Sequence, residues 1–222
     1  MLVVDDKTMV LGGVAILLAL LSPIVNALIL KLKVGKSDID GSSLPVNDVS
    51  LPGISVVMTV DDEGEDLKKN LPQWLDQSYG GRYQVIVVVS GNDPQVESIL
   101  KRYSGSPSLY TTFIPSSSRY MSRKKLAVTI GVKAARYDWV LLTDVDCYPE
   151  KATFLDSISR RSISGDCQMV LGYSNFSSDA PSARLFDNTY SLYRQLALSQ
   201  RGRTAGYSGK VVLFRKSMFI EG

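Results

Sequence analysis

The sequence contains no histidine and only two cysteines, Cys147 and Cys167. The lack of histidine excludes Ser-His-Asp and Cys-His catalytic triads, histidine-ligated zinc and an imidazole general base. Two cysteines are too few for a four-cysteine zinc site or a disulfide framework, and their scarcity suits a reducing compartment. The formal net charge of the 222 residues is only +3. This charge is too small to indicate a nucleic-acid partner.

The first part of the chain has one long uncharged run, Thr8–Leu30. At ~1.5 Å per residue, a helix of this length is roughly 34 Å long and crosses a bilayer core. A cleaved signal peptide fits less well, because the start is acidic and the run leads directly into lysines. Three lysines follow the run and one precedes it, which predicts that the rest of the chain is cytoplasmic. We expect a single-pass membrane anchor over residues 1–34, a polar linker over 35–53 and a cytoplasmic domain over 54–222.

From residue 54 onward, short apolar runs rich in β-branched residues alternate with stretches of helical periodicity. This alternation predicts an α/β fold with a mostly parallel sheet flanked by helices. On the helix expected over 122–136, Leu126 and Ile130 should face the sheet. The predicted strands are 54–60, 85–89, 109–114, 139–143, 169–173 and 211–214. The predicted helices are 66–77, 94–103, 122–136, 150–159 and 183–199.

Acidic or polar clusters follow three of these strands. Asp61–Glu63 follows the first strand, Ser90–Asp93 follows the second, and Asp144–Asp146 follows the strand at 139–143. Ligands bind beyond the carboxyl ends of parallel strands, so we expect the three clusters to share one edge of the sheet. Carboxylates that meet there need a cation between them, and Mg²⁺ or Mn²⁺ would keep coordination positions for phosphate oxygens. The expected ligand is a diphosphate with its metal.

Each cluster also has a simpler explanation. The acids of 144–146 are also explained as surface residues, those of 61–63 as favourable charges at a helix start, and 90–93 as a capping turn. The segment Gly206–Lys210 superficially looks like a phosphate loop, but it lacks the glycine spacing and has Val211 where Ser or Thr is required. A basic group fits either phosphate neutralisation or a solvated helix start. It comprises Arg119, Arg123, Lys124 and Lys125.

Several segments in order resemble family 2 glycosyltransferases with the GT-A fold. Residues 54–63 (ISVVMTVDDE), 71–79 and 85–91 (VIVVVSG) are similar to the start of that family. Residues 123–146 are similar to its segment leading into D-x-D, and residues 170–174 and 206–216 to its later strands. The resemblance covers residues 51–222 and rests on the order and spacing of these motifs.

The resemblance implies an inverting, metal-dependent transfer of a sugar from a nucleotide-diphosphate donor to a hydroxyl of an acceptor glycan, lipid or polysaccharide. It places Val60 and Glu63 at the nucleoside, the turn Ser90–Asp93 at the base, and Lys125 near the nucleotide. Asp146 would be the principal ligand of Mn²⁺ or Mg²⁺, and Asp144 would meet the ribose or the metal. The implied donor-binding residues are thus Val60, Glu63, Ser90, Asp93, Lys125 and Asp144.

The sequence departs from the family pattern in three places. The first strand runs into Thr59–Glu63 without the usual proline and asparagine, and the second ends in Ser90, where the family usually has aspartate. The acidic catalytic base is expected beyond Gly222, so we expect a chain truncated before it. Two other hypotheses stay open. One is a different nucleotide-binding α/β enzyme such as a nucleotidyltransferase, which a glycine-rich phosphate loop would indicate, and the other is a non-catalytic membrane-tethered fragment.

Overall fold

The structure is a computed structural model that describes residues 6–29, 50–115, 122–163, 167–177, 179–199 and 210–221. The chain divides into two compact units. One unit comprises Asp38–Ser174 with Gly209–Gly222 and contains the sheet. The other comprises Met1–Ser37 with Asn175–Ser208 and contains helices α1 (Asp6–Ile29) and α6 (Ser182–Ser199).

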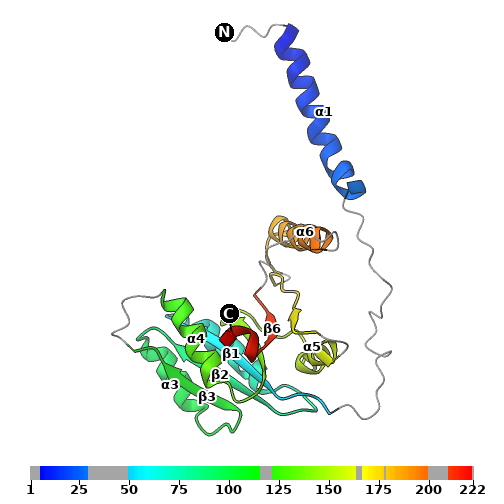
Figure 1. The fold of residues 1–222 in the computed structure, drawn as a ribbon. Coiled ribbons are helices and arrows are strands. Elements are labelled where there is room, and N and C mark those ends of the chain that lie inside the picture. Colours follow the sequence, from blue (N-terminus) through cyan, green and yellow to red (C-terminus); the bar gives the residue numbers. More distant parts are fainter. Residues whose placement is uncertain are drawn as a thin grey trace. The chain divides into compact units, whose positions relative to one another are not determined.

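Among the described residues, the sheet has six strands in the order β3-β2-β1-β4-β6-β5, of which Figure 1 labels β1, β2, β3 and β6. Strands β1, β2, β3 and β4 are mutually parallel, whereas β6 runs antiparallel to both β4 and β5. The predicted α/β fold with a mostly parallel sheet is therefore confirmed. The strands are β1 (Ile54–Val60), β2 (Tyr83–Val89), β3 (Leu109–Phe113), β4 (Trp139–Asp144), β5 (Met169–Leu171) and β6 (Val212–Arg215).

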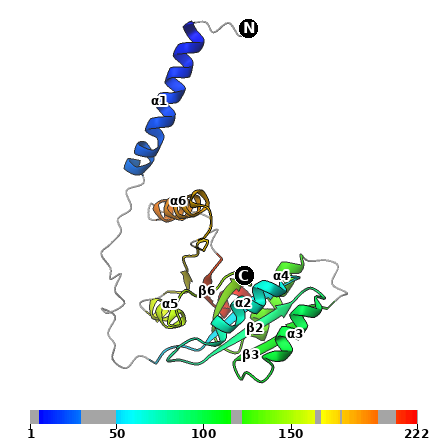
Figure 2. The same ribbon diagram turned by 180° about the vertical axis from the view of Figure 1, so that it is seen from behind.

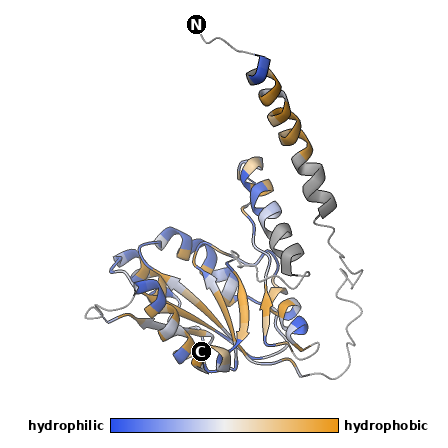
Figure 3. Cartoon of the chain, turned by 45° about the horizontal axis from the view of Figure 1, so that its top comes forward, coloured by the Kyte–Doolittle hydropathy of each residue, from blue (hydrophilic) through white to orange (hydrophobic). Residues whose placement is uncertain are grey.

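Helices cover both faces of the sheet. Alternate strand residues point to opposite faces, and the two sets pack against different helices. Val56, Met58 and Val60 of β1 lie in one buried cluster with apolar residues of α2 (Gly64–Leu75), α3 (Pro94–Arg102) and α5 (Phe154–Ile163). Val57, between them, belongs to a second cluster with residues of α4 (Arg123–Ala134). Figure 2 shows α2 and α3 from the other side, and Figure 3 shows the apolar strands between the more polar helices.

Helix α4 differs in part from its predicted orientation. We expected Leu126 and Ile130 to face the sheet. Both are partly buried, and Ile130 packs against the second cluster, but the buried residues of the helix are Ala127, Gly131 and Val132. Small residues allow the helix to lie close to the strands: a Cβ at Gly131 would lie 3.1 Å from Cγ2 of Val88 and closer still to Val57. A search for large apolar side chains misses such a contact.

Helix α5 begins at Phe154, four residues later than predicted. The backbone around this helix start is bonded to the segment after α2. The N–H of Ser78 donates to the carbonyl of Ala152 at 2.8 Å, and the N–H of Leu155 donates to Oε1 of Gln77 at 3.2 Å. The C-terminal helix α7 (Lys216–Glu221) was not predicted.

Helix α1 is strongly apolar, and its described side chains are exposed. Within the described residues, none of the helices combines the length and the apolar character that a membrane crossing requires. The expected anchor therefore stays a prediction, and most of the expected linker over 35–53 lies outside the described residues.

Candidate functional site

The carboxyl ends of β1, β2 and β4 lie at the same edge of the sheet because these strands are parallel and in register. A cleft of about 360 Å³ opens at this edge. The turns after all three strands contribute to its walls, so the predicted meeting of the three clusters is confirmed. The cleft is lined by Thr59, Val60, Asp61, Glu63, Asp66, Ser90, Arg123, Lys124, Ala127, Asp144, Val145, Asp146 and Lys210.

The turn after β4 carries two carboxylates with different lysine partners. Asp144 is the last residue of β4, and its carbonyl accepts a hydrogen bond from the N–H of Cys147 at 3.1 Å, which closes the turn. Its carboxylate accepts hydrogen bonds from Nζ of Lys124, at 3.1 Å to Oδ1 and 3.4 Å to Oδ2. Lys124 lies in the first turn of α4, so this helix presents a cation to the end of β4.

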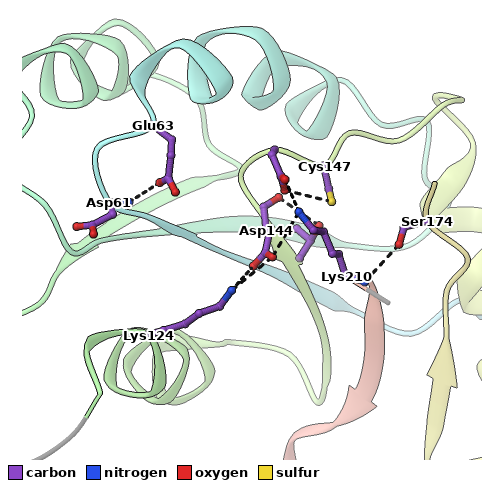
Figure 4. Close-up of polar contacts among 9 residues, drawn as sticks. Asp61, Glu63, Lys124, Asp144, Cys147, Ser174 and Lys210 are labelled. Atoms are coloured by element: carbon purple, nitrogen blue, oxygen red, sulfur yellow. Dashed lines mark hydrogen bonds and ion pairs between the residues drawn. The ribbon is translucent and has the colours of Figure 1, made fainter. Parts of the chain in front are cut away.

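Lys210 approaches the same turn from the segment before β6 (Figure 4). Its Nζ donates to Oδ2 of Asp146 and lies 4.0 Å from Oδ2 of Asp144. Its backbone N–H donates to Oγ of Ser174 at 3.3 Å. Partial burial lowers the pKa of the Lys210 ammonium, but the hydrogen bond and charge of Asp146 outweigh this, so the pKa lies above its usual value. Lys210 is therefore positively charged at neutral pH.

Helix α2 supports the turn after β4 from behind. Nδ2 of the buried Asn70 donates to the carbonyl of Val145 at 2.9 Å, and Nε1 of Trp74 donates to the carbonyl of Cys147 at 2.9 Å. Two carbonyls in the turn are thus held by side chains one helical turn apart. Trp74 also packs edge-on against Phe154, with 5.8 Å between the ring centroids.

The turns after β1 and β2 are tied to each other. The N–H of Ser90 donates to the carbonyl of Val60 at 2.7 Å, and its Oγ donates to Oδ1 of Asp61 at 3.0 Å. The N–H of Asp61 in turn donates to Oε2 of Glu63 at 2.8 Å. Gly91 lies so close that a Cβ there would be 2.6 Å from the carbonyl oxygen of Asp61. The short side chains at this point let the two turns pack together.

A second hollow of about 550 Å³ adjoins the first and shares Asp61 and Arg123 with it. Asp62, Gly91, Asn92 and Asp93 complete its lining. Asp93 is also the N-cap of α3, where Oδ1 accepts a hydrogen bond from the N–H of Gln95 at 2.8 Å. The capping explanation for this turn is therefore confirmed, and the turn still reaches a hollow beside the cleft.

The thiol of Cys147 lies beside the acidic turn, with Sγ 3.5 Å from Oδ1 of Asp146. Burial, together with the nearby charge of Asp146, raises the pKa of Cys147 to about 11. The thiol therefore stays protonated at neutral pH, and it is a poor nucleophile because the thiolate is the reactive form.

Asp144 and Asp146 fit a hard divalent cation by their chemistry. Within the described part of the chain, no three histidine, cysteine, aspartate or glutamate side chains are grouped to hold a metal. Mg²⁺ in phosphate-binding sites needs only one or two carboxylates, because water and phosphate supply the other ligands. One ammonium, that of Lys210, is within ion-pair distance of both carboxylates. A single cation can therefore be reached by both aspartates.

All but one of the residues expected to bind the donor line one of the two hollows. Val60, Glu63, Ser90, Asp144 and Asp146 line the cleft, whereas Asp93 lines the adjoining hollow. Lys125 lines neither hollow; its neighbour Lys124 lines the cleft and contacts Asp144. Arg119 lies outside the described residues. Sequence reasoning missed the roles of Lys210, Asn70 and Trp74 at this site, and only the discarded phosphate-loop likeness had drawn attention to Lys210.

The family model for glycosyl transferase family 2 matches residues 55–222. Mannosyltransferase PcManGT from Pyrobaculum calidifontis, solved in complex with GDP-Man and Mn²⁺, has a similar fold, with a TM-score of 0.62 and 16% sequence identity. The match covers 96% of this chain and 56% of that chain, so this chain spans little more than half its length.

S. aureus TarS 1-349, solved in complex with UDP, matches 58% of this chain and 38% of that chain, with 16% identity and a TM-score of 0.49. No curated protein is significantly similar to this sequence. The family model covers most of the chain, including all six strands but the first residue of β1, and every residue lining the cleft. The chain belongs to glycosyl transferase family 2.

Proposed function

We propose that this chain is the donor-binding part of a glycosyltransferase that moves a sugar from a nucleotide-diphosphate donor to an acceptor hydroxyl. The observation that carries the proposal is the cleft where three acidic or polar turns meet, with the carboxylates of Asp144 and Asp146 within reach of one cation. The fold neighbour solved with GDP-Man and Mn²⁺ supports a nucleotide-sugar donor. The match to the family model makes the nucleotidyltransferase alternative the less favoured one.

Within this proposal, the two hollows hold different parts of the donor. The cleft lined by Lys124, Lys210 and Arg123 would take the diphosphate, because ammonium and guanidinium groups neutralise phosphate oxygens. The adjoining hollow, lined by Asn92 and Asp93, would take the base. Val60 and Glu63 line the cleft and would meet the nucleoside.

The reaction would invert the anomeric carbon. A divalent ion held by Asp146 and Asp144 would neutralise charge on the leaving diphosphate. Lys124, at the start of α4, would hold the carboxylate of Asp144 in place, and Asn70 would fix the turn through the carbonyl of Val145. A carboxylate would deprotonate the acceptor hydroxyl, which belongs to a glycan, lipid or polysaccharide. We assign this base to none of the described residues.

The test measures the binding of UDP, GDP, dTDP and the corresponding nucleotide sugars, with and without Mn²⁺, by thermal shift and then by calorimetry. We expect one nucleotide to bind in the presence of Mn²⁺, and Asp146→Ala to weaken this binding at least ~100-fold, because a metal–phosphate link contributes several kcal/mol. Asp76→Ala is the control, since this exposed residue lies at the opposite end of α2. Equal donor binding by Asp146→Ala and wild type would contradict the metal site.

We also propose that the apolar helix α1 attaches the protein to a membrane, with the sheet-containing unit on the cytoplasmic side. The uncharged run Thr8–Leu30 and the exposed apolar side chains of α1 support this. Attachment predicts that the full chain sediments with membranes after carbonate washing, whereas a chain starting at residue 50 does not. Release of the full chain by carbonate would contradict the proposal.

A further inference from the structure

The ammonium of Lys210 lies between the two carboxylates of the turn after β4. Nζ donates to Asp146 and is 4.0 Å from Oδ2 of Asp144 (Figure 4). Of the residues that the structure describes, Lys210 is the one whose ammonium is within ion-pair distance of both aspartates. Lys124 contacts Asp144 at 3.1 Å and forms the second ion pair of the turn.

The charges of this turn are balanced without a metal. Two carboxylates face two ammonium groups. A divalent ion that enters beside Asp144 and Asp146 meets the ammonium of Lys210 at the same oxygens, and two positive charges at ~4 Å repel each other even in water. A donor diphosphate that enters with the ion restores the balance, because its roughly two negative charges offset the two positive charges of the ion. The ion and the diphosphate are therefore favoured together and disfavoured singly.

The anchoring of Lys210 allows its side chain to change partners while its backbone stays in place. The N–H of Lys210 donates to Oγ of Ser174, and the carbonyl of the buried Val211 accepts a hydrogen bond from the N–H of Gly172 at 2.8 Å. The side chain itself is nearly half exposed. The four-carbon stem of a lysine is flexible, so the ammonium can reach new acceptors several ångströms away with little cost to the fold.

Resting on the function proposed above, we infer that Lys210 occupies the metal position in the donor-free protein and moves to the donor diphosphate when the ion enters. Lys210 is thus both the competitor of the metal and a ligand of the diphosphate. Metal and nucleotide then bind cooperatively, and by thermodynamic reciprocity each increases the affinity of the other by the same factor.

The test is Lys210→Met, which keeps the length of the stem and removes the charge. Binding of Mn²⁺ alone is followed by the electron paramagnetic resonance signal of the free ion, and binding of UDP and GDP at saturating Mn²⁺ by calorimetry. We expect Lys210→Met to bind Mn²⁺ alone about tenfold more tightly than wild type, because one competing charge is gone. We expect the same variant to bind the nucleotide about tenfold more weakly, because one ammonium–phosphate pair is lost.

Three further variants separate this pattern from a loss of structure. Lys101→Met, on the exposed face of α3, is the matched control and should leave both affinities unchanged. Lys124→Met removes a cation that contacts Asp144 alone and should tighten Mn²⁺ binding less than Lys210→Met does. Lys210→Arg keeps the charge and should retain weak Mn²⁺ binding and most of the nucleotide affinity. Circular dichroism would establish that each variant is folded.

The outcomes distinguish the two proposals. If wild type binds neither UDP nor GDP in the presence of Mn²⁺ while other nucleotides also fail, the proposed function is wrong. If wild type binds a nucleotide with Mn²⁺ and folded Lys210→Met has the wild-type affinity for Mn²⁺ alone, the function stands and the role of Lys210 is wrong. Weaker Mn²⁺ binding by Lys210→Met would also overturn the inference, because a competitor cannot help the ion to bind.

Discussion

The two halves of the cleft rim satisfy their acidic groups differently. In the turn after β4, Asp144 and Asp146 are each paired with a lysine ammonium. In the turns after β1 and β2, Asp61, Glu63 and Asp93 accept hydrogen bonds from neutral donors. Asp61 bonds to the hydroxyl of Ser90, and Glu63 bonds to a backbone N–H.

This difference indicates a division of labour along one sheet edge. A carboxylate paired with a cation can exchange that cation for another, so the β4 half suits a divalent ion and the phosphates that come with it. A carboxylate held by hydroxyl and amide donors keeps its remaining lone pairs for neutral donors, so the β1–β2 half suits ribose hydroxyls and base N–H groups. Substitutions in one half should therefore leave the other half intact.

The largest effect is expected from Asp144→Asn combined with Asp146→Asn. This pair removes the charge of the β4 half, so stimulation of nucleotide binding by Mn²⁺ should fall by at least ~100-fold. Lys124 and Lys210 lose their carboxylate partners, so binding without Mn²⁺ should tighten by about tenfold. Calorimetry with and without Mn²⁺ measures both changes.

The matched control changes two adjacent acids of the other half, Asp61→Asn with Asp62→Asn. Because these residues are outside the β4 turn, the variant should keep its stimulation by Mn²⁺ even if its absolute affinity falls. Equal loss of stimulation in both double variants would contradict the division between the two halves.

A smaller effect is expected from Gly91→Ala, which separates the turns after β1 and β2. The added Cβ would lie 2.6 Å from the carbonyl oxygen of Asp61 and 2.8 Å from its carbonyl carbon, and backbone atoms cannot swing away as a side chain does. We expect a loss of about 2 kcal/mol in the free energy of unfolding, as for other overpacked sites. Urea denaturation measures it.

Gly105→Ala is the control for this substitution, because nothing lies within 4 Å of a Cβ at that position. It should leave stability nearly unchanged.

Gly91→Ala should also weaken nucleotide binding with and without Mn²⁺ by the same factor, since the β4 half is untouched. A selective loss of the Mn²⁺-dependent part would show that the halves are not independent.

The sheet and the meeting of the three turns could be predicted because they follow from local patterns. Runs such as Val85–Val89 are apolar on both faces, which favours a covered parallel strand, and parallel strands bring their carboxyl ends to one edge. The acids after β1 and β4 were therefore expected at the same edge of the sheet once the strands were recognised.

The cations of the site could not be predicted in the same way. Lys210 and Asp146 are 64 residues apart, and their contact depends on where a loop leads and how a long side chain turns. At the start of α4, a shift of one residue rotates a helix by ~100°, so Lys124 faces the cleft and Lys125 does not. Neither contact can be predicted from hydrophobic periodicity.

The smallest effect is expected from Asn70→Ala, which removes a support of the β4 half without touching a charge. The carbonyl of Val145 would lose its donor at 2.9 Å inside the protein, and a buried unpaired carbonyl costs about 1–2 kcal/mol. Oδ1 of Asn70 has no hydrogen-bond partner among the described residues, so the substitution removes one unsatisfied atom while creating another.

Stability and metal affinity together decide what Asn70 does. If Asn70 only fills space, the free energy of unfolding falls and the Mn²⁺-dependent affinity for the nucleotide stays as in wild type. If it positions the turn, that affinity falls by about three- to tenfold while binding without Mn²⁺ is unchanged. Gln73→Ala, a partly exposed position on the same helix whose Nε2 donates to the local carbonyl of Lys69, is the control and should change neither quantity. The side chain of Asn70 contacts the turn after β4 at a backbone carbonyl and not at a carboxylate. A selective loss would therefore establish that this half of the rim depends on geometry as well as on charge.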